Sequence, residues 1–113
     1  MLTLKPVDFI ISLEDILPSE KFVLKEVRKV FVYQNNQKTD KVWGYRYKLV
    51  DPIKFETFEV KVEQREPIVT AQMLEESDKL WVSLEGAVIK PYKMAYPFVD
   101  YTIVAQKINL LKE

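Results

Sequence analysis

Residues 41–49 read Lys41-Val42-Trp43-Gly44-Tyr45-Arg46-Tyr47-Lys48-Leu49, a pattern typical of a β-strand. Successive side chains of an extended strand point to opposite faces of the sheet. The alternation gives two sets, Trp43, Tyr45, Tyr47 and Leu49 on one face and Val42, Arg46 and Lys48 on the other. Aromatic rings beside basic side chains are typical of surfaces that stack bases and hold phosphates. The same rings are equally typical of the packed side of a β-sheet.

The chain on both sides of this stretch continues the β pattern. Alternating apolar side chains predict strands over residues 22–33, 55–63, 79–85 and 98–110. A change of period after Pro67 predicts a short helix from Thr70 to Ser77, with Thr70 as its N-cap. Residues 90–97 hold two prolines and two tyrosines and are predicted to form a loop. This order predicts a mostly β fold: a small barrel of five to six strands, similar to the oligonucleotide/oligosaccharide-binding (OB) fold, with the helix between the third and fourth strands.

The length of 113 residues is enough for one domain with its own core and too short for two. We expect residues 1–20 to form an N-terminal arm packed on a domain of residues 21–113. No apolar run is long enough for a membrane span, and the first residues lack the pattern of a secretion signal. Together with the absence of cysteine, these features favour a cytoplasmic protein that does not bind membranes.

The composition excludes the commonest catalytic and metal-binding arrangements. Without histidine or cysteine the chain cannot form a Ser-His-Asp triad, a Cys-His pair or a usual zinc site. The only two glycines, Gly44 and Gly86, do not form a phosphate-binding loop. The adjacent Glu75 and Glu76 do not share a helix face, so they are interpreted as a solvated pair. We therefore expect no enzymatic activity, no cofactor and no metal.

Charge is balanced overall but unevenly distributed along the chain. The formal net charge is zero and the pI is about 6.4. Residues 21–54 carry nine basic and three acidic side chains, whereas residues 55–88 carry three basic and eight acidic ones. Such a separation can build a basic face on a neutral protein. Any affinity for DNA is expected to be modest and sensitive to salt.

The expected topology brings several of these features to one surface. In an OB-fold, the ligand groove lies on the face of strands two and three, between the first and fourth loops. Here that groove would be formed by residues 43–49, 55–62, 34–40 and 90–97. The predicted nucleic-acid-binding residues are Trp43, Tyr45, Arg46, Tyr47, Lys48, Trp81, Lys90, Tyr92, Lys93 and Tyr96.

Each of these residues also has a purely structural interpretation. The rings of residues 43–47 would pack across strands, and the basic side chains would belong to a solvated sheet face. Trp81 would be either an exposed stacking platform or a ring covered by the N-terminal arm. Residues 90–97 would be only a connection shaped by proline. The sequence leaves these alternatives open.

Five segments together resemble a known group of proteins: Gly44-Tyr45-Arg46-Tyr47-Lys48-Leu49, Phe58-Glu59-Val60-Lys61-Val62, Trp81-Val82-Ser83-Leu84-Glu85-Gly86, Lys90-Pro91-Tyr92 and Tyr101-Thr102-Ile103-Val104-Ala105. The chain resembles the small OB-like accessory proteins of Gram-positive mobile genetic elements, namely the YdcP-like helicase-processivity proteins and the single-strand-binding proteins of conjugative elements, plasmids and phages. The resemblance implies a noncatalytic protein of DNA replication or conjugation that binds single-stranded DNA. It also implies a helicase or polymerase as a possible protein partner.

Two alternative functions fit the same sequence. The first is a protein-interaction subunit whose acidic stretch, residues 56–85, docks a helicase or polymerase without binding DNA alone. The second is a phage structural domain. The sequence leaves the oligomeric state, the base preference and the identity of the partner open.

Overall fold

The computed structural model describes residues 10–17, 19–95 and 98–111, and for residues 92–95 and 98–100 it describes the backbone alone. The chain is mostly β with one short α-helix among the described residues, as predicted. The elements in chain order are β1 (Ile11–Ser12), the 3-10 turn η2 (Leu13–Asp15), β2 (Phe22–Gln34), β3 (Gln37–Val50), β4 (Thr57–Glu63), α1 (Ala71–Glu76), β5 (Trp81–Glu85), β6 (Val88–Ala95), β7 (Phe98–Ala105) and β8 (Lys107–Leu110).

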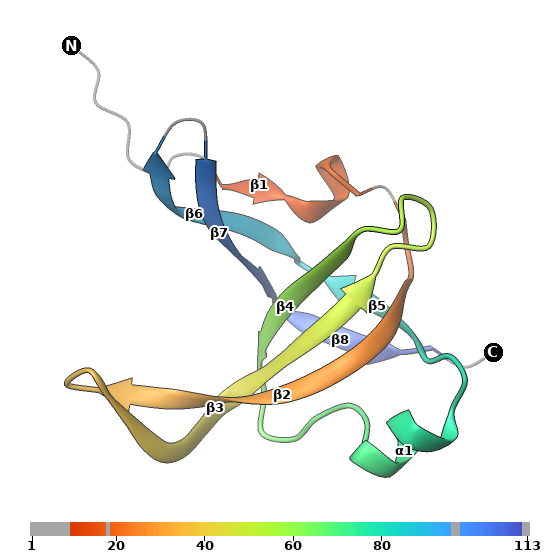
Figure 1. The fold of residues 1–113 in the computed structure, drawn as a ribbon, viewed down its shortest axis with the longest axis horizontal. Helices are drawn as coiled ribbons and strands as arrows, with labels where there is room; N and C mark the ends of the chain where they lie inside the picture. Colours follow the sequence, from red (N-terminus) through yellow and green to blue (C-terminus); the bar gives the residue numbers. More distant parts are fainter. Residues whose placement is uncertain (1–9, 18, 96–97, 112–113) are drawn as a thin grey trace.

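The strands form one strongly curved sheet in the order β1-β6-β7-β4-β3-β2-β5-β8 (Figure 1). Its centre is the antiparallel meander β2–β3–β4, and β7 runs parallel to β4. Over the described residues the sheet has eight strands and is open, with β1 and β8 at its edges. It differs in both respects from the closed barrel of five to six strands that the sequence predicts.

Two facing bends explain the larger strand count. Gly86 and Ala87 separate β5 from β6, and Gln106 separates β7 from β8. Gly86 has a φ of 64°, in the left-handed region that favours glycine. The backbone N–H of Gln106 donates to the carbonyl of Glu85 at 2.9 Å, which holds the two bends together. Because the pairing between strands is interrupted at both bends, residues 81–95 form the two strands β5 and β6, and β7 is separate from β8.

The predicted loop over residues 90–97 was wrong for residues 90–95, and residues 96 and 97 lie outside the described residues. The strand β6 continues through Lys90 to Ala95 and pairs with β7. Among the described residues, β1 pairs with β6 only at Val88 and Ile89, so Pro91 lies beyond the described pairs, and a register shift follows it. Edge positions and bulges are where a strand tolerates proline. Residues 34–40, expected to form the first loop of the groove, mostly belong to strands, because Asn35 and Asn36 adopt left-handed φ values of 53° and 63° and close a tight hairpin between β2 and β3.

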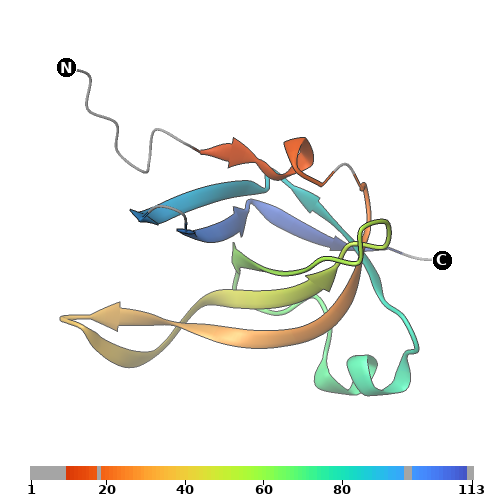
Figure 2. The same ribbon diagram turned by 45° about the horizontal axis from the view of Figure 1, so that its top comes forward.

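The core lies between the meander and the strands β5 to β8, which form a second layer in Figure 2. Its most deeply buried apolar side chains are Tyr47, Leu49, Val60, Val62 and Val82. Phe22 and Phe58 meet edge to face, with ring centroids 5.2 Å apart. The helix α1 begins as predicted at Thr70, whose side chain accepts a hydrogen bond from the Met73 N–H at 3.1 Å. Within the described part of the chain, no helix has the length and apolarity to cross a membrane.

The described part of the N-terminal arm is fixed to the sheet. Leu13 and Leu17 are buried, and the N–H of Leu13 donates to the carbonyl of Ala87 at 3.0 Å. The ammonium of Lys54, in the β3–β4 connection, donates to the carbonyl of Ile16 at 3.2 Å. Ser19 donates a hydrogen bond from its hydroxyl to the buried carboxylate of Asp51. The arm is therefore packed against the rest of the molecule at least from residue 11 to residue 17.

Asp51 anchors the β3–β4 connection from inside. Burial alone would raise the pKa of its carboxyl, but hydrogen bonds from Ser19 and from the backbone N–H groups of Lys54 and Ile53 outweigh burial and lower that pKa. The Lys54 N–H lies 3.0 Å from Oδ2 of Asp51. The connection is thereby held in one conformation beside the arm.

Candidate nucleic-acid interface

A groove of about 620 Å³ hollows the outer side of β3, β4 and β7. Its charged and polar lining comes from all three strands and comprises Arg46, Lys48, Thr57, Glu59, Lys61, Tyr101 and Thr102. Two hairpins, β2–β3 and β6–β7, extend to the same side of the molecule (Figures 1 and 2). The groove strands belong to these two hairpins and to β4, which lies between them in the sheet.

Three cations form one row across the sheet, which we call the cationic row: Arg28, Arg46 and Lys61. Arg46 on β3 is in register with Arg28 on β2 and with Lys61 on β4. Neighbouring strands lie about 4.8 Å apart, and like charges directly opposite each other destabilise a sheet. The next row alternates in sign, since Lys48 is in register with Glu26 and Glu59. The cationic row is therefore an electrostatic cost that a bound anion would remove.

Carboxylates neutralise only part of this face. Arg28 Nε lies 2.8 Å from Oε1 of Glu26, and Arg46 Nε lies 3.6 Å from Oε2 of Glu59. Neither Lys48 nor Lys61 has an ion pair with a described residue. Burial lowers the pKa of the Lys61 ammonium, and the positive charge of Arg46 lowers it further. A phosphate beside Lys61 would favour its charged form.

Two of the predicted nucleic-acid-binding residues line this groove. Arg46 and Lys48 line it side by side with Lys61. Lys90 is exposed on β6 and in register with Thr102 of β7, so its side chain lies on the same face next to the groove. Of the other predicted residues, Tyr92 and Lys93 are in β6, where the structure describes their backbone but not their side chains. Tyr96 lies outside the described residues.

Tyr45 and Tyr47 lie in the core instead. Their exposed fractions are 8% and 0%. The hydroxyl of Tyr47 donates to Oε1 of Gln64 and accepts a hydrogen bond from the Ile68 N–H at 3.1 Å. Burial raises the pKa of this hydroxyl. Neither ring is open to a base in this structure, so we interpret both as core residues and leave them out of the proposed interface.

The two tryptophans lie away from the groove. Val30 is in register with Gly44 and Phe31 with Val42, so Trp43 is the extra residue of a β-bulge and no longer continues the face of Tyr45. Trp81 begins β5, on the other side of β2 from the groove, and the ammonium of Lys21 lies 4.6 Å from its ring centroid. Both indoles are half-buried, and neither lines the groove. The structure thus offers no set of exposed rings on the predicted strand.

Sequence reasoning missed three residues of this surface. Lys61 falls in an acidic block of the sequence, and only the register shows that it faces Arg46. The place of Arg28 in the cationic row is likewise shown only by the strand register, which pairs Arg28 with Arg46. Tyr101 lies at the rim of the groove with 54% of its side chain exposed. Its position in an alternating apolar strand gave no signal that it would be exposed.

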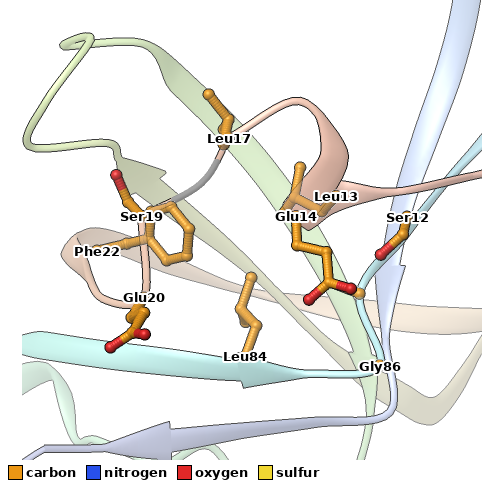
Figure 3. A pocket seen from close by; sticks show the side chains of 10 residues that line it. Ser12, Leu13, Glu14, Leu17, Ser19, Glu20, Phe22, Leu84 and Gly86 are labelled. Atoms are coloured by element: carbon orange, nitrogen blue, oxygen red, sulfur yellow. The ribbon is translucent and has the colours of Figure 1, made fainter.

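A second cavity, of about 450 Å³, has the opposite electrostatic character. It lies between the arm and the strands β2 and β5 (Figure 3). In that view, Leu84 lies between the carboxylates of Glu14 and Glu20. None of the described residues that line it is basic, so this cavity does not suit a polyanion. The described residues also contain no group of three acidic side chains that could hold a metal ion.

Comparisons with protein-family models, with curated proteins and with solved structures found no match for this chain.

Proposed function

We propose that this chain is a noncatalytic, OB-like protein that binds single-stranded DNA and acts as an accessory factor in the replication or transfer of a mobile genetic element. The observation that carries the proposal is the cationic row across β2, β3 and β4, at the edge of a groove of about 620 Å³. In this mechanism the row holds successive phosphates of the strand, as basic grooves do in single-strand-binding proteins.

The strand pairings support the OB-like part of the proposal. If β5–β6 and β7–β8 are each counted as one bent strand, the sheet has five long strands: β2, β3, β4, β5–β6 and β7–β8. These five strands pair with one another as the strands of an OB-fold do. The first pairs with the fourth (β2 with β5), and the third runs parallel to the fifth (β4 with β7). The proposed binding face is then that of strands two and three, which is the one OB-folds use.

A second candidate function has its own observation. At the β3–β4 connection, Ile53 and Phe55 expose 67% and 79% of their side chains, and Phe55 has a φ of 58°. A positive φ is unusual for a bulky residue, and the two exposed apolar side chains lie close enough in the chain to be covered together by one partner. A helicase or polymerase docked on this connection would make the chain a protein-interaction subunit. Both functions fit one accessory factor.

Titration of labelled oligo-dT, followed by fluorescence anisotropy, tests the proposed DNA binding. If three phosphates contact the cationic row, log K should fall with log salt with a slope of about −2, which is roughly a 16-fold loss of affinity between 50 and 200 mM salt. Absence of binding at 50 mM salt would reject DNA binding by the isolated chain. Co-purification with a protein partner that resists nuclease treatment would then favour the second candidate.

A further inference from the structure

We propose that Tyr101 and the apolar pocket beside it receive an unpaired base of the bound strand. This inference rests on the proposed function, because it takes the cationic row as the phosphate site. In the proposed site, the base lies in the pocket and stacks on the ring of Tyr101.

The pocket has a volume of about 330 Å³ and is lined by residues of the N-terminal arm and of the strands β4 and β7. Ile11 and Ile16 of the arm form one wall and expose 41% and 47% of their side chains. Phe58 and Ile103 form part of the opposite wall. The wall from the arm is fixed, since the carbonyl of Ile16 accepts a hydrogen bond from Lys54.

The pocket continues directly from the cationic groove. Thr57, Phe58, Tyr101 and Ile103 line both cavities. A strand whose phosphates lie on Arg46 and Lys61 therefore has an apolar cavity next to it, with the exposed ring of Tyr101 at the junction.

A base fits this position better than an apolar side chain of a partner protein. A nucleotide joins an anionic group to a flat apolar ring, as the groove and the pocket together require. The lining of the pocket also includes Lys54, Glu56 and Thr57, and these polar groups can meet the polar edge of a base. A purely apolar partner would leave the neighbouring lysines without a counter-charge.

The test compares two labelled strands of equal length and charge, oligo-dT and a strand of abasic sites, on three proteins. These are the wild type, Tyr101→Ala, and the matched control Tyr101→Phe, which keeps the ring. We expect the wild type to bind oligo-dT more tightly than the abasic strand. Tyr101→Ala should lose about tenfold to hundredfold in affinity for oligo-dT and little for the abasic strand, with the salt slope unchanged. Tyr101→Phe should bind like the wild type.

The outcomes separate this inference from the proposed function. Tight binding of both strands, unaffected by Tyr101→Ala, would overturn the base site alone and leave the pocket to an apolar protein side chain. No binding of either strand by the wild type would overturn the proposed function, and the base site with it. Circular dichroism of each variant checks folding, and Tyr101→Leu, which keeps an apolar side chain without the aromatic ring, replaces the alanine variant if that one fails to fold.

Discussion

Replacing Arg46 and Lys61 with glutamine should weaken binding of oligo-dT by about 60-fold at 50 mM salt. Each phosphate contact on a single strand contributes about −0.7 to the slope of log K against log salt. Loss of two contacts therefore lowers log K by roughly 1.8 at 50 mM salt. The slope itself should fall from about −2 to about −0.7. Because both residues belong to the cationic row and line the groove, the two changes remove adjacent charges from one surface.

The matched control is the double variant Lys79→Gln and Lys107→Gln, which removes the same charge from exposed lysines outside the groove. It should keep both the affinity and the salt slope close to those of the wild type. Equal losses in the two double variants would mean that binding depends on total charge and not on the row. An unchanged affinity in the groove variant would exclude the row as the phosphate site.

Gly44→Ala should lower the free energy of unfolding by about 3 kcal/mol or more, measured by urea denaturation. A Cβ at this position would lie 2.1 Å from the carbonyl oxygen of Val62 and 2.9 Å from the Cα of Glu63. Both atoms belong to the backbone of β4, which is in register with β3 here and cannot move without breaking the ladder.

Gly86→Ala is the informative comparison for this prediction. A Cβ there would meet the side chain of Gln106, which is flexible, so the main cost is the positive φ of 64°. That cost is about 1 kcal/mol. If Gly44→Ala is no more destabilising than Gly86→Ala, then β3 and β4 do not approach each other as closely as the structure shows.

The sequence predicted the elements well because their signals are local. Alternation of apolar and polar side chains identified the meander, and Thr70 marked the start of α1. The loop predicted over residues 90–97 failed because proline was taken as a break. Its effect depends on whether the neighbouring strand needs its N–H, and Pro91 lies beyond the described β1–β6 pairs and beside a register shift with β7.

The candidate site was predicted only in part, because it depends on pairing between distant segments. Alternation separates the two faces of β3 but does not say which face is inside. Tyr45 and Tyr47 are inside because Phe58, Val60 and Val62 of β4 continue the same buried face. The bulge at Trp43 and the meeting of residues 11–17 with Tyr101 arise from register and from the path of the arm. The glycine beside Trp43 is typical of a bulge, whereas the meeting of the arm with Tyr101 has no signal in the residues concerned.

The most direct test of the account is to map where oligo-dT contacts the folded protein by the chemical-shift changes of backbone amides in NMR titrations. We predict the largest changes in residues 46–48 of β3, 59–61 of β4 and 101–103 of β7, with the amides around Trp81 unaffected. Changes that centre on Trp81 and β8, on the far side of β2, would contradict the claim that the cationic row and its groove form the DNA-binding surface.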